Sequence, residues 1–71
     1  MNEDFGKWYA NAKRGMESPH ASDDFVDRVI EGMKRDAKIN YLDYHKDIVK
    51  FLDAEAKEIK SNNAKARKIY E

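Results

Sequence analysis

The stretch Ser22-Asp23-Asp24-Phe25-Val26-Asp27-Arg28-Val29-Ile30-Glu31-Gly32-Met33 decides the fold of this chain. Its large apolar residues recur at intervals of three and four, which is the period of a helix with one buried face. Ser22 has a side chain that caps helix starts, and Asp23 and Asp24 follow where the helix dipole favours negative charge. The stretch predicts a helix over residues 23–38. Its core-facing residues are expected to be Phe25, Val26, Val29, Ile30, Met33 and Ala37.

A shorter apolar stripe precedes this helix and consists of Phe5, Trp8, Tyr9, Ala12 and Met16. Its spacing predicts a helix over residues 3–16, with Asn2 as the N-cap. Gly6 lowers the helical propensity by about 1 kcal/mol relative to alanine, so we expect this helix to depend on docking. Pro19, in the polar stretch between the two helices, disfavours one helix running through both. We expect Phe5, Trp8 and Phe25 to meet in the core.

After residue 40 the apolar residues continue at helical spacing but in a different phase, as Tyr44, Ile48, Phe51, Leu52, Ala56 and Ile59. They predict a third helix over residues 41–60, capped by Asn40. No glycine or proline separates the two stripes, so one bent helix over residues 23–60 is the alternative. We favour a turn near residue 40 because a compact chain needs a reversal there to close a core. Residues 61–71 are expected to form a basic tail that frays, because Ser61-Asn62-Asn63 forms helix poorly.

The predicted fold class is therefore all-α, either a small three-helix bundle or a helical hairpin with an extra N-terminal helix. Residues 1–60 are expected to form a single helical domain, followed by the tail of residues 61–71. No run of four or more residues alternates as a strand would. With 71 residues the core is small, and stability is expected to be marginal without a partner.

No constellation for catalysis or metal binding is evident. The chain contains no cysteine, which removes disulfides and thiolate ligands. His45 lies two residues from Asp43 and from Asp47, a spacing that separates neighbours by about 200° around a helix. His20 lies beside carboxylates that serve the following helix start. The serines have cap or turn roles and no glycine-rich phosphate loop is present, so we predict a protein that is not an enzyme and holds no metal or cofactor.

Membrane insertion is not expected either. No apolar run approaches the roughly 20 residues that cross a bilayer. The N-terminal residues lack the basic start and apolar stretch of a signal peptide. These features predict a soluble, cytoplasmic protein without a membrane partner.

The charged residues balance over the whole chain, with 14 basic and 14 acidic side chains, but not along it. Residues 17–31 hold five acidic residues and one arginine, whereas residues 57–71 hold five basic and two acidic residues. A chain with this separation can pair with itself head-to-tail or present two differently charged faces to a partner. A protein that binds nucleic acid globally is normally much more basic.

The eight aromatic residues exceed what a minimal three-helix core requires. Because Trp and Tyr anchor many protein interfaces, the leading prediction is a regulatory or structural protein-binding module. Its candidate partner-binding residues are Trp8, Tyr9, Phe25, Val29 and Ile30, with Asp23, Asp24 and Asp27 orienting a basic partner. An alternative is a nucleic-acid-associated accessory protein, whose candidate phosphate contacts are Lys57, Lys60, Lys65, Arg67 and Lys68. The third prediction is a self-associating bundle, a homo-oligomer without another partner.

Two segments resemble the N-terminal cytoplasmic region of some bacterial anti-sigma factors. They are Trp8-Tyr9-Ala10-Asn11-Ala12-Lys13-Arg14-Gly15-Met16 and, after the Ser18-Pro19 break, Asp24-Phe25-Val26-Asp27-Arg28-Val29-Ile30. In that region a helix with Trp and Tyr precedes a short polar loop and a second helix that opens on a Phe-x-x-Arg-Val pattern. The resemblance implies a helical domain that wraps a sigma factor and blocks its contact with core polymerase. The chain departs from the family in lacking its transmembrane segment and sensory domain, and the His/Cys zinc motif of another branch.

Overall fold

Helix α2 (Asp23–Asn40) begins at the predicted cap. In the computed structural model, which describes residues 3–70, the Ser22 hydroxyl accepts a hydrogen bond from the Phe25 amide at 3.1 Å. At the other end, the Tyr41 amide donates to the Ala37 carbonyl at 2.8 Å. The predicted start is confirmed, and the helix ends slightly beyond residue 38.

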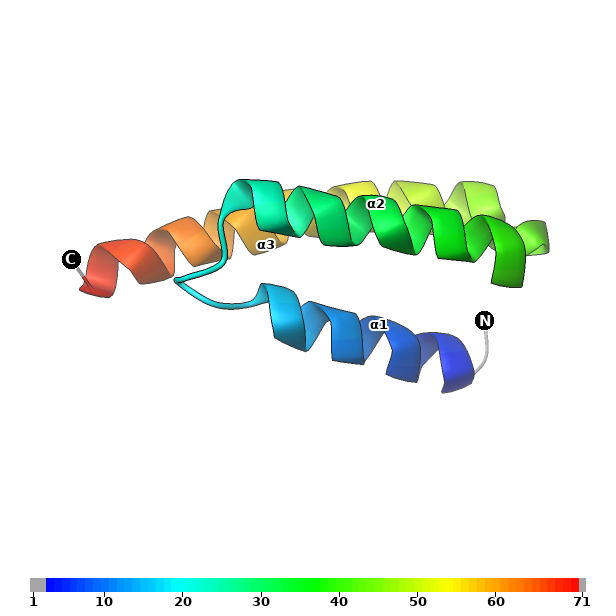
Figure 1. The fold of residues 1–71 in the computed structure, drawn as a ribbon, viewed down its shortest axis with the longest axis horizontal. Helices are drawn as coiled ribbons and strands as arrows, with labels where there is room; N and C mark the ends of the chain where they lie inside the picture. The colour runs from blue at the N-terminus through cyan, green and yellow to red at the C-terminus, as the bar shows by residue number, and fades with distance from the viewer. Residues whose placement is uncertain (1–2, 71) are drawn as a thin grey trace.

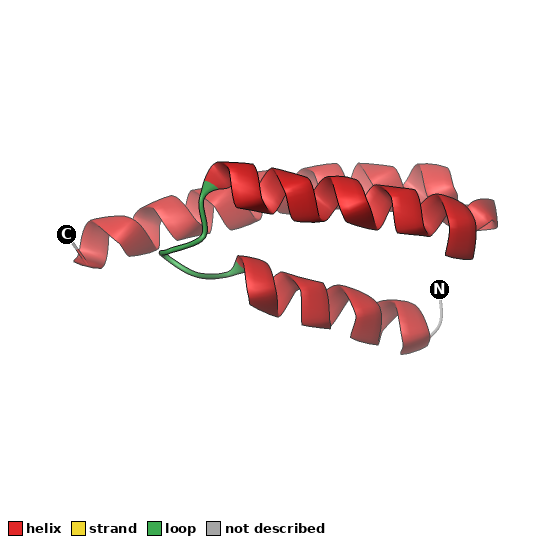
Figure 2. Cartoon of the chain, in the orientation of Figure 1, coloured by secondary structure: helices red, strands yellow, loops and turns green. Residues whose placement is uncertain are grey.

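Three α-helices make up the described part of the chain, which contains no strand (Figure 2). They are α1 (Glu3–Met16), α2 and α3 (His45–Tyr70), and a 3-10 turn, η1 (Leu42–Tyr44), immediately precedes α3. Helices α2 and α3 run side by side in opposite directions as a hairpin, and α1 lies along one side of it (Figure 1). The all-α class is confirmed, in the form of a helical hairpin with an extra N-terminal helix.

The chain reverses direction around Tyr41, so one bent helix over residues 23–60 does not form. The prediction that Asn40 caps the third helix is wrong, because Asn40 is the last residue of α2 and α3 begins only at His45. The Tyr44 amide donates to the Tyr41 carbonyl at 2.9 Å and closes the intervening 3-10 turn. Tyr41 stands at the N-cap position of that turn without a side-chain hydrogen bond.

Helix α3 extends to Tyr70, past the predicted end at residue 60. Fraying after residue 60 is therefore not observed in the residues described. The physical reason is tertiary contact: Asn63 is buried against the end of α1, and the Arg67 guanidinium lies 3.5 Å from Asp23. The last turns of α3 thus have partners that the apolar pattern did not reveal.

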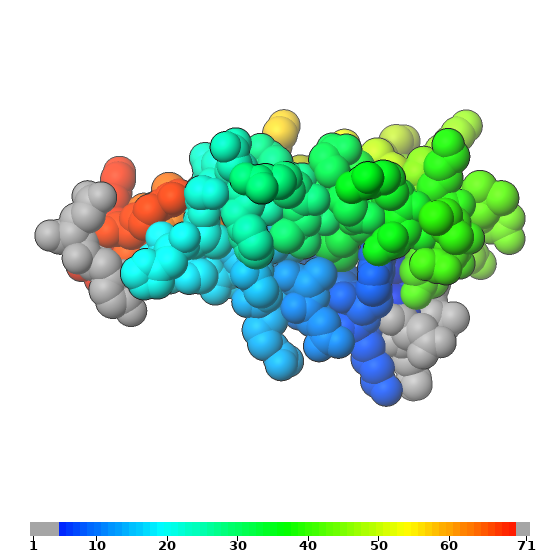
Figure 3. All heavy atoms as spheres, viewed as in Figure 1, coloured from blue at the N-terminus to red at the C-terminus, as the bar shows by residue number. Residues whose placement is uncertain are grey.

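The core forms where α1 closes over the α2–α3 hairpin. Its buried apolar side chains are Phe5, Met16, Ala21, Val26, Ile30, Met33, Ala37, Ile48, Leu52, Ala56 and Ile59. Phe25 is 44% exposed, so the prediction that it joins Phe5 and Trp8 in the core is wrong. The buried stripe of α2 runs through Val26, and the preceding residue points about 100° away around the helix. Figure 3 shows side chains of α1 and α2 in contact across the space between the two ribbons.

Candidate interaction surfaces

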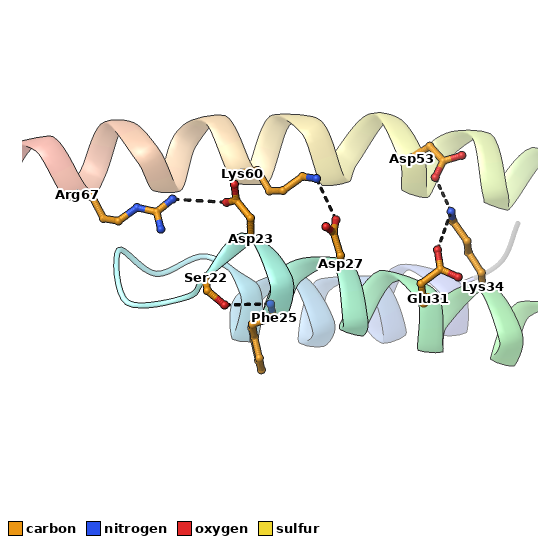
Figure 4. A network of polar contacts seen from close by, with 9 residues as sticks. All are labelled: Ser22, Asp23, Phe25, Asp27, Glu31, Lys34, Asp53, Lys60 and Arg67. Carbon is orange, nitrogen blue, oxygen red and sulfur yellow. Dashed lines mark hydrogen bonds and ion pairs between the residues drawn. The ribbon is translucent and has the colours of Figure 1, made fainter.

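Four of the eight predicted charged residues face each other across the α2–α3 hairpin (Figure 4). The Lys60 ammonium donates to the Asp27 carboxylate at 2.9 Å. The Arg67 guanidinium lies 3.5 Å from the Asp23 carboxylate. Two of the acidic residues predicted to orient a partner are thus paired with two of the residues predicted to contact phosphates. All four side chains are partly exposed, so water and salt screen both pairs and each pair contributes little to stability.

A third ion pair, of opposite polarity, joins the helices nearer the turn. Lys34 Nζ, on α2, lies 2.5 Å from the Asp53 carboxylate of α3 and 3.4 Å from Glu31 (Figure 4). The hydrogen bond to Asp53 raises the pKa of Lys34, and the hydrogen bond to Asp27 raises the pKa of Lys60. Both amines therefore stay charged throughout the neutral range.

The remaining charged candidates are exposed. Asp24, Lys57, Lys65 and Lys68 have no ion pair among the residues that the structure describes. Three lysines thus remain from the five residues predicted to contact phosphates. Binding to nucleic acid stays a prediction, and a steep loss of affinity with salt is its expected signature.

Trp8 and Tyr9 are half-buried between α1 and the hairpin. The Trp8 ring centre lies 5.6 Å from that of Tyr41, and the Tyr9 ring centre lies 4.9 Å from that of Phe51. The Tyr9 hydroxyl also donates a hydrogen bond to the Glu55 carboxylate of α3. Both predicted interface aromatics therefore hold α1 in place within this chain.

The residues of the predicted apolar face of α2 differ in exposure. Ile30 is buried in the core and Val29 is half-buried against it. Phe25 is exposed, beside a shallow surface hollow at the corner where α1 leads into α2. The structure therefore does not bring these three residues together on one exposed surface.

Sequence reasoning missed the buried Asn63. The residue is only 3% exposed, and its side-chain amide donates to the Met16 carbonyl at 2.8 Å. Its carbonyl oxygen accepts from the Ser18 amide at 3.2 Å. The signal that could have revealed it is position, because Asn63 lies four residues after Ile59 on the buried stripe of α3. A polar residue at that point needs partners, and the end of α1 supplies them.

The α2–α3 turn carries a cluster of exposed apolar side chains, none of which is among the predicted partner-binding residues given above. We call this cluster, Ile39, Leu42 and Tyr44, the hairpin tip. The exposed fractions are 78% for Ile39, 68% for Leu42 and 51% for Tyr44. These residues line a shallow hollow together with Tyr41, which is half-buried. The tip is the densest group of exposed large apolar residues in the described part of the chain.

Alkaline pH is expected to weaken the fold through Tyr9. Burial, followed by the hydrogen bond to Glu55, raises the pKa of Tyr9 above its ordinary value near 10. The unfolded chain therefore loses this proton first, so the stabilisation is complete below about pH 10 and is lost as the pH rises through the folded-state pKa. We expect the stability advantage of wild type over Tyr9→Phe to shrink above about pH 10.

Urea unfolding followed by circular dichroism at a series of pH values measures this difference. Lys34 and Lys60 also have raised pKa values, but they are common to both proteins and cancel in the comparison. A difference that stays constant into the alkaline range would contradict the assignment to Tyr9.

Comparison with known proteins gave no match to a family model, a curated protein or a solved structure. The resemblance to anti-sigma factors therefore stays a prediction. Within the described residues, no helix is long and apolar enough to cross a membrane. The same residues contain no group of three or more His, Asp or Glu side chains placed to hold a metal ion.

Proposed function

We propose that this protein is a small helical binding module that docks its hairpin tip into an apolar pocket on another protein. The observation that carries the proposal is the exposure of three large apolar side chains at the tip. Removing such side chains from water drives most protein association, and isolated domains rarely leave them clustered at the surface without a role.

The charges around the tip favour a protein partner over a nucleic acid. Lys38 and Lys46 are offset by Asp43 and Asp47, and all four are exposed. A phosphate backbone is attracted by a strongly cationic surface, which these four residues do not provide. The hairpin tip is therefore complementary to a neutral, apolar pocket on another protein.

The small size of the tip favours a concave partner over a second copy of the same tip. A stable protein interface buries about 800 Å² on each partner. Three side chains at one end of a narrow hairpin fall short of that area when they meet another convex end. A partner with a pocket surrounds them and also covers the flanking turn.

The test begins by replacing Tyr44 with a photo-reactive phenylalanine derivative and crosslinking in the source cell. The captured protein is then purified and titrated with wild type, Leu42→Asp and Ile69→Asp. Leu42→Asp is expected to weaken binding about thirtyfold, the effect of losing a 2 kcal/mol hot spot. Ile69→Asp is the matched control, because Ile69 is 82% exposed and lies near the C-terminal end of α3, away from the hairpin tip.

Equal weakening by the two substitutions, or no specific capture from Tyr44, contradicts docking through the tip. Circular dichroism of the variants checks that the helices are intact. Both replaced side chains are exposed, so neither substitution is expected to disturb the core.

A further inference from the structure

Helix α1 is fastened to the hairpin by two polar anchors on α3. Asn63 bonds to the Met16 carbonyl and the Ser18 amide, at the C-terminal end of α1. Glu55, whose side chain is only 18% exposed, accepts a hydrogen bond from Tyr9 and lies 3.7 Å from Lys13 Nζ. Among the described residues, α1 and the residues just after it supply all of these polar partners. If α1 left the groove, these hydrogen bonds and the burial of Phe5 and Met16 would be lost, and only an equivalent helix in the groove would restore them.

Helix α1 is also weak as a helix on its own. It has 14 residues, a length at which isolated helices are marginal in water. A Cβ atom added at Gly6 or at Gly15 would meet no atom of another part of the chain within 4 Å, so packing does not require either glycine. Gly6, in the interior of α1, lowers the stability of the helix by about 0.8–1 kcal/mol relative to alanine. Gly15 is the second-last residue of α1, where this cost is smaller. Helix α1 therefore depends on being docked in a groove of this shape, and a second hairpin with the same groove stabilises it equally well.

The α2–α3 hairpin has a separate set of stabilising contacts. Its ion pairs join Asp23 to Arg67, Asp27 to Lys60 and Lys34 to Asp53, and none involves α1. Its apolar seam includes Ile48 and Leu52, which are fully buried. The contacts within the hairpin and the contacts of α1 thus form two sets, and the segment from Glu17 to Ser22 links the two units.

We propose that α1 is an exchangeable arm, and that two copies of the chain form a dimer by docking each arm on the other hairpin. A helix that fills the groove after α1 has left needs a hydroxyl and an ammonium one turn apart to contact Glu55. It also needs to end beside Asn63. Tyr9, Lys13 and Met16 of a second copy meet these requirements by identity. Exchange of identical elements costs little because every contact is recovered between the chains.

Pro19 directs how the link between the units opens. Within a continuous helix, proline lacks the amide that would bond to the Gly15 carbonyl, and its ring clashes with that carbonyl. Helices α1 and α2 therefore cannot fuse into one rod when the Ser18–Ala21 turn opens. In the exchanged dimer the segment from Glu17 to Ser22 is extended, so that α1 reaches the neighbouring hairpin. This inference concerns the groove beneath α1 and does not depend on the hairpin tip.

The test mixes unlabelled and 15N-labelled wild-type chains over a range of concentrations. A carbodiimide then joins neighbouring amines and carboxylates, and the peptides are analysed by mass spectrometry. In an arm-exchanged dimer, the Lys13–Glu55 crosslink unites one light and one heavy peptide in a fraction that grows with concentration. The Lys60–Asp27 crosslink is the matched control, because its 2.9 Å contact lies within the hairpin and stays within one chain.

Mixed labels at Lys13–Glu55 with uniform labels at Lys60–Asp27 support the exchange of α1. Uniform labels at both sites up to millimolar concentration overturn it. A dimer with uniform labels at Lys13–Glu55 also overturns it, because the chains then meet through another face. Mixed labels at both sites overturn it as well, because they show that the hairpin itself has been exchanged.

Discussion

An Asn63→Ala variant is expected to unfold with a free energy about 1–2 kcal/mol lower than that of wild type. The substitution removes the two hydrogen bonds of the Asn63 side chain, whereas the Ser18 amide still donates to the Met16 carbonyl at 3.1 Å. Each lost hydrogen bond costs about 0.5–1.5 kcal/mol, and the loss is offset in part by the better helical propensity of alanine. Urea unfolding, followed by circular dichroism, measures the change.

Asn62→Ala is the matched control for this experiment. Asn62 is the preceding residue of the same helix, but it is exposed. The substitution changes helical propensity in the same way and removes no buried hydrogen bond, so it is expected to be neutral or slightly stabilising. If both variants shift the unfolding midpoint equally, Asn63 does not hold the end of α1 as described.

A Leu52→Ala variant is expected to lose about 3–5 kcal/mol of stability, a large share of the total for a domain of this size. Leu52 is fully buried in the seam between the helices. Its truncation removes apolar contact and leaves a cavity that a thin, three-helix core can fill only in part. Thermal and urea unfolding of the variant, side by side with wild type, measure the loss.

The other leucine of the chain provides the comparison. Leu42 is 68% exposed at the hairpin tip, so Leu42→Ala is expected to change stability by less than about 0.5 kcal/mol. The same chemical change thus separates a residue needed for folding from one that the proposed function needs for binding. A large loss of stability in Leu42→Ala would contradict the exposed position of the tip.

The start of α2 was predictable because local chemistry decides it. A serine cap and two aspartates act within a single turn, and no distant residue is needed to satisfy the Ser22–Phe25 hydrogen bond. The location of the reversal was also predictable, since the apolar stripe changes phase near residue 40. The cap residue was not, because the 3-10 turn after Tyr41 has no side-chain hydrogen bond to mark it.

The candidate surfaces were harder to predict, since they depend on which helix faces meet. Phe25 and Val26 are equally apolar, and only the position of α1 and α3 determines that Phe25 is exposed. Asp27 and Lys60 each suggested a charged surface, whereas the antiparallel hairpin brings them together. Asn63 was interpreted only as a poor helix former. Its buried role was missed because the Met16 carbonyl that it contacts lies on α1, far away in the sequence.

The order of the three cross-helix ion pairs also favours one register of the hairpin. Going from its start, α2 presents Asp23, Asp27 and Lys34 to Arg67, Lys60 and Asp53 of α3. Sliding α3 by two helical turns in one direction would set Asp27 against Asp53, and in the other direction it would set Lys34 against Lys60. The short turn of residues 41–44 already aligns the two helices. The ion pairs thus add a penalty against a slipped alignment, because like charges would then face each other.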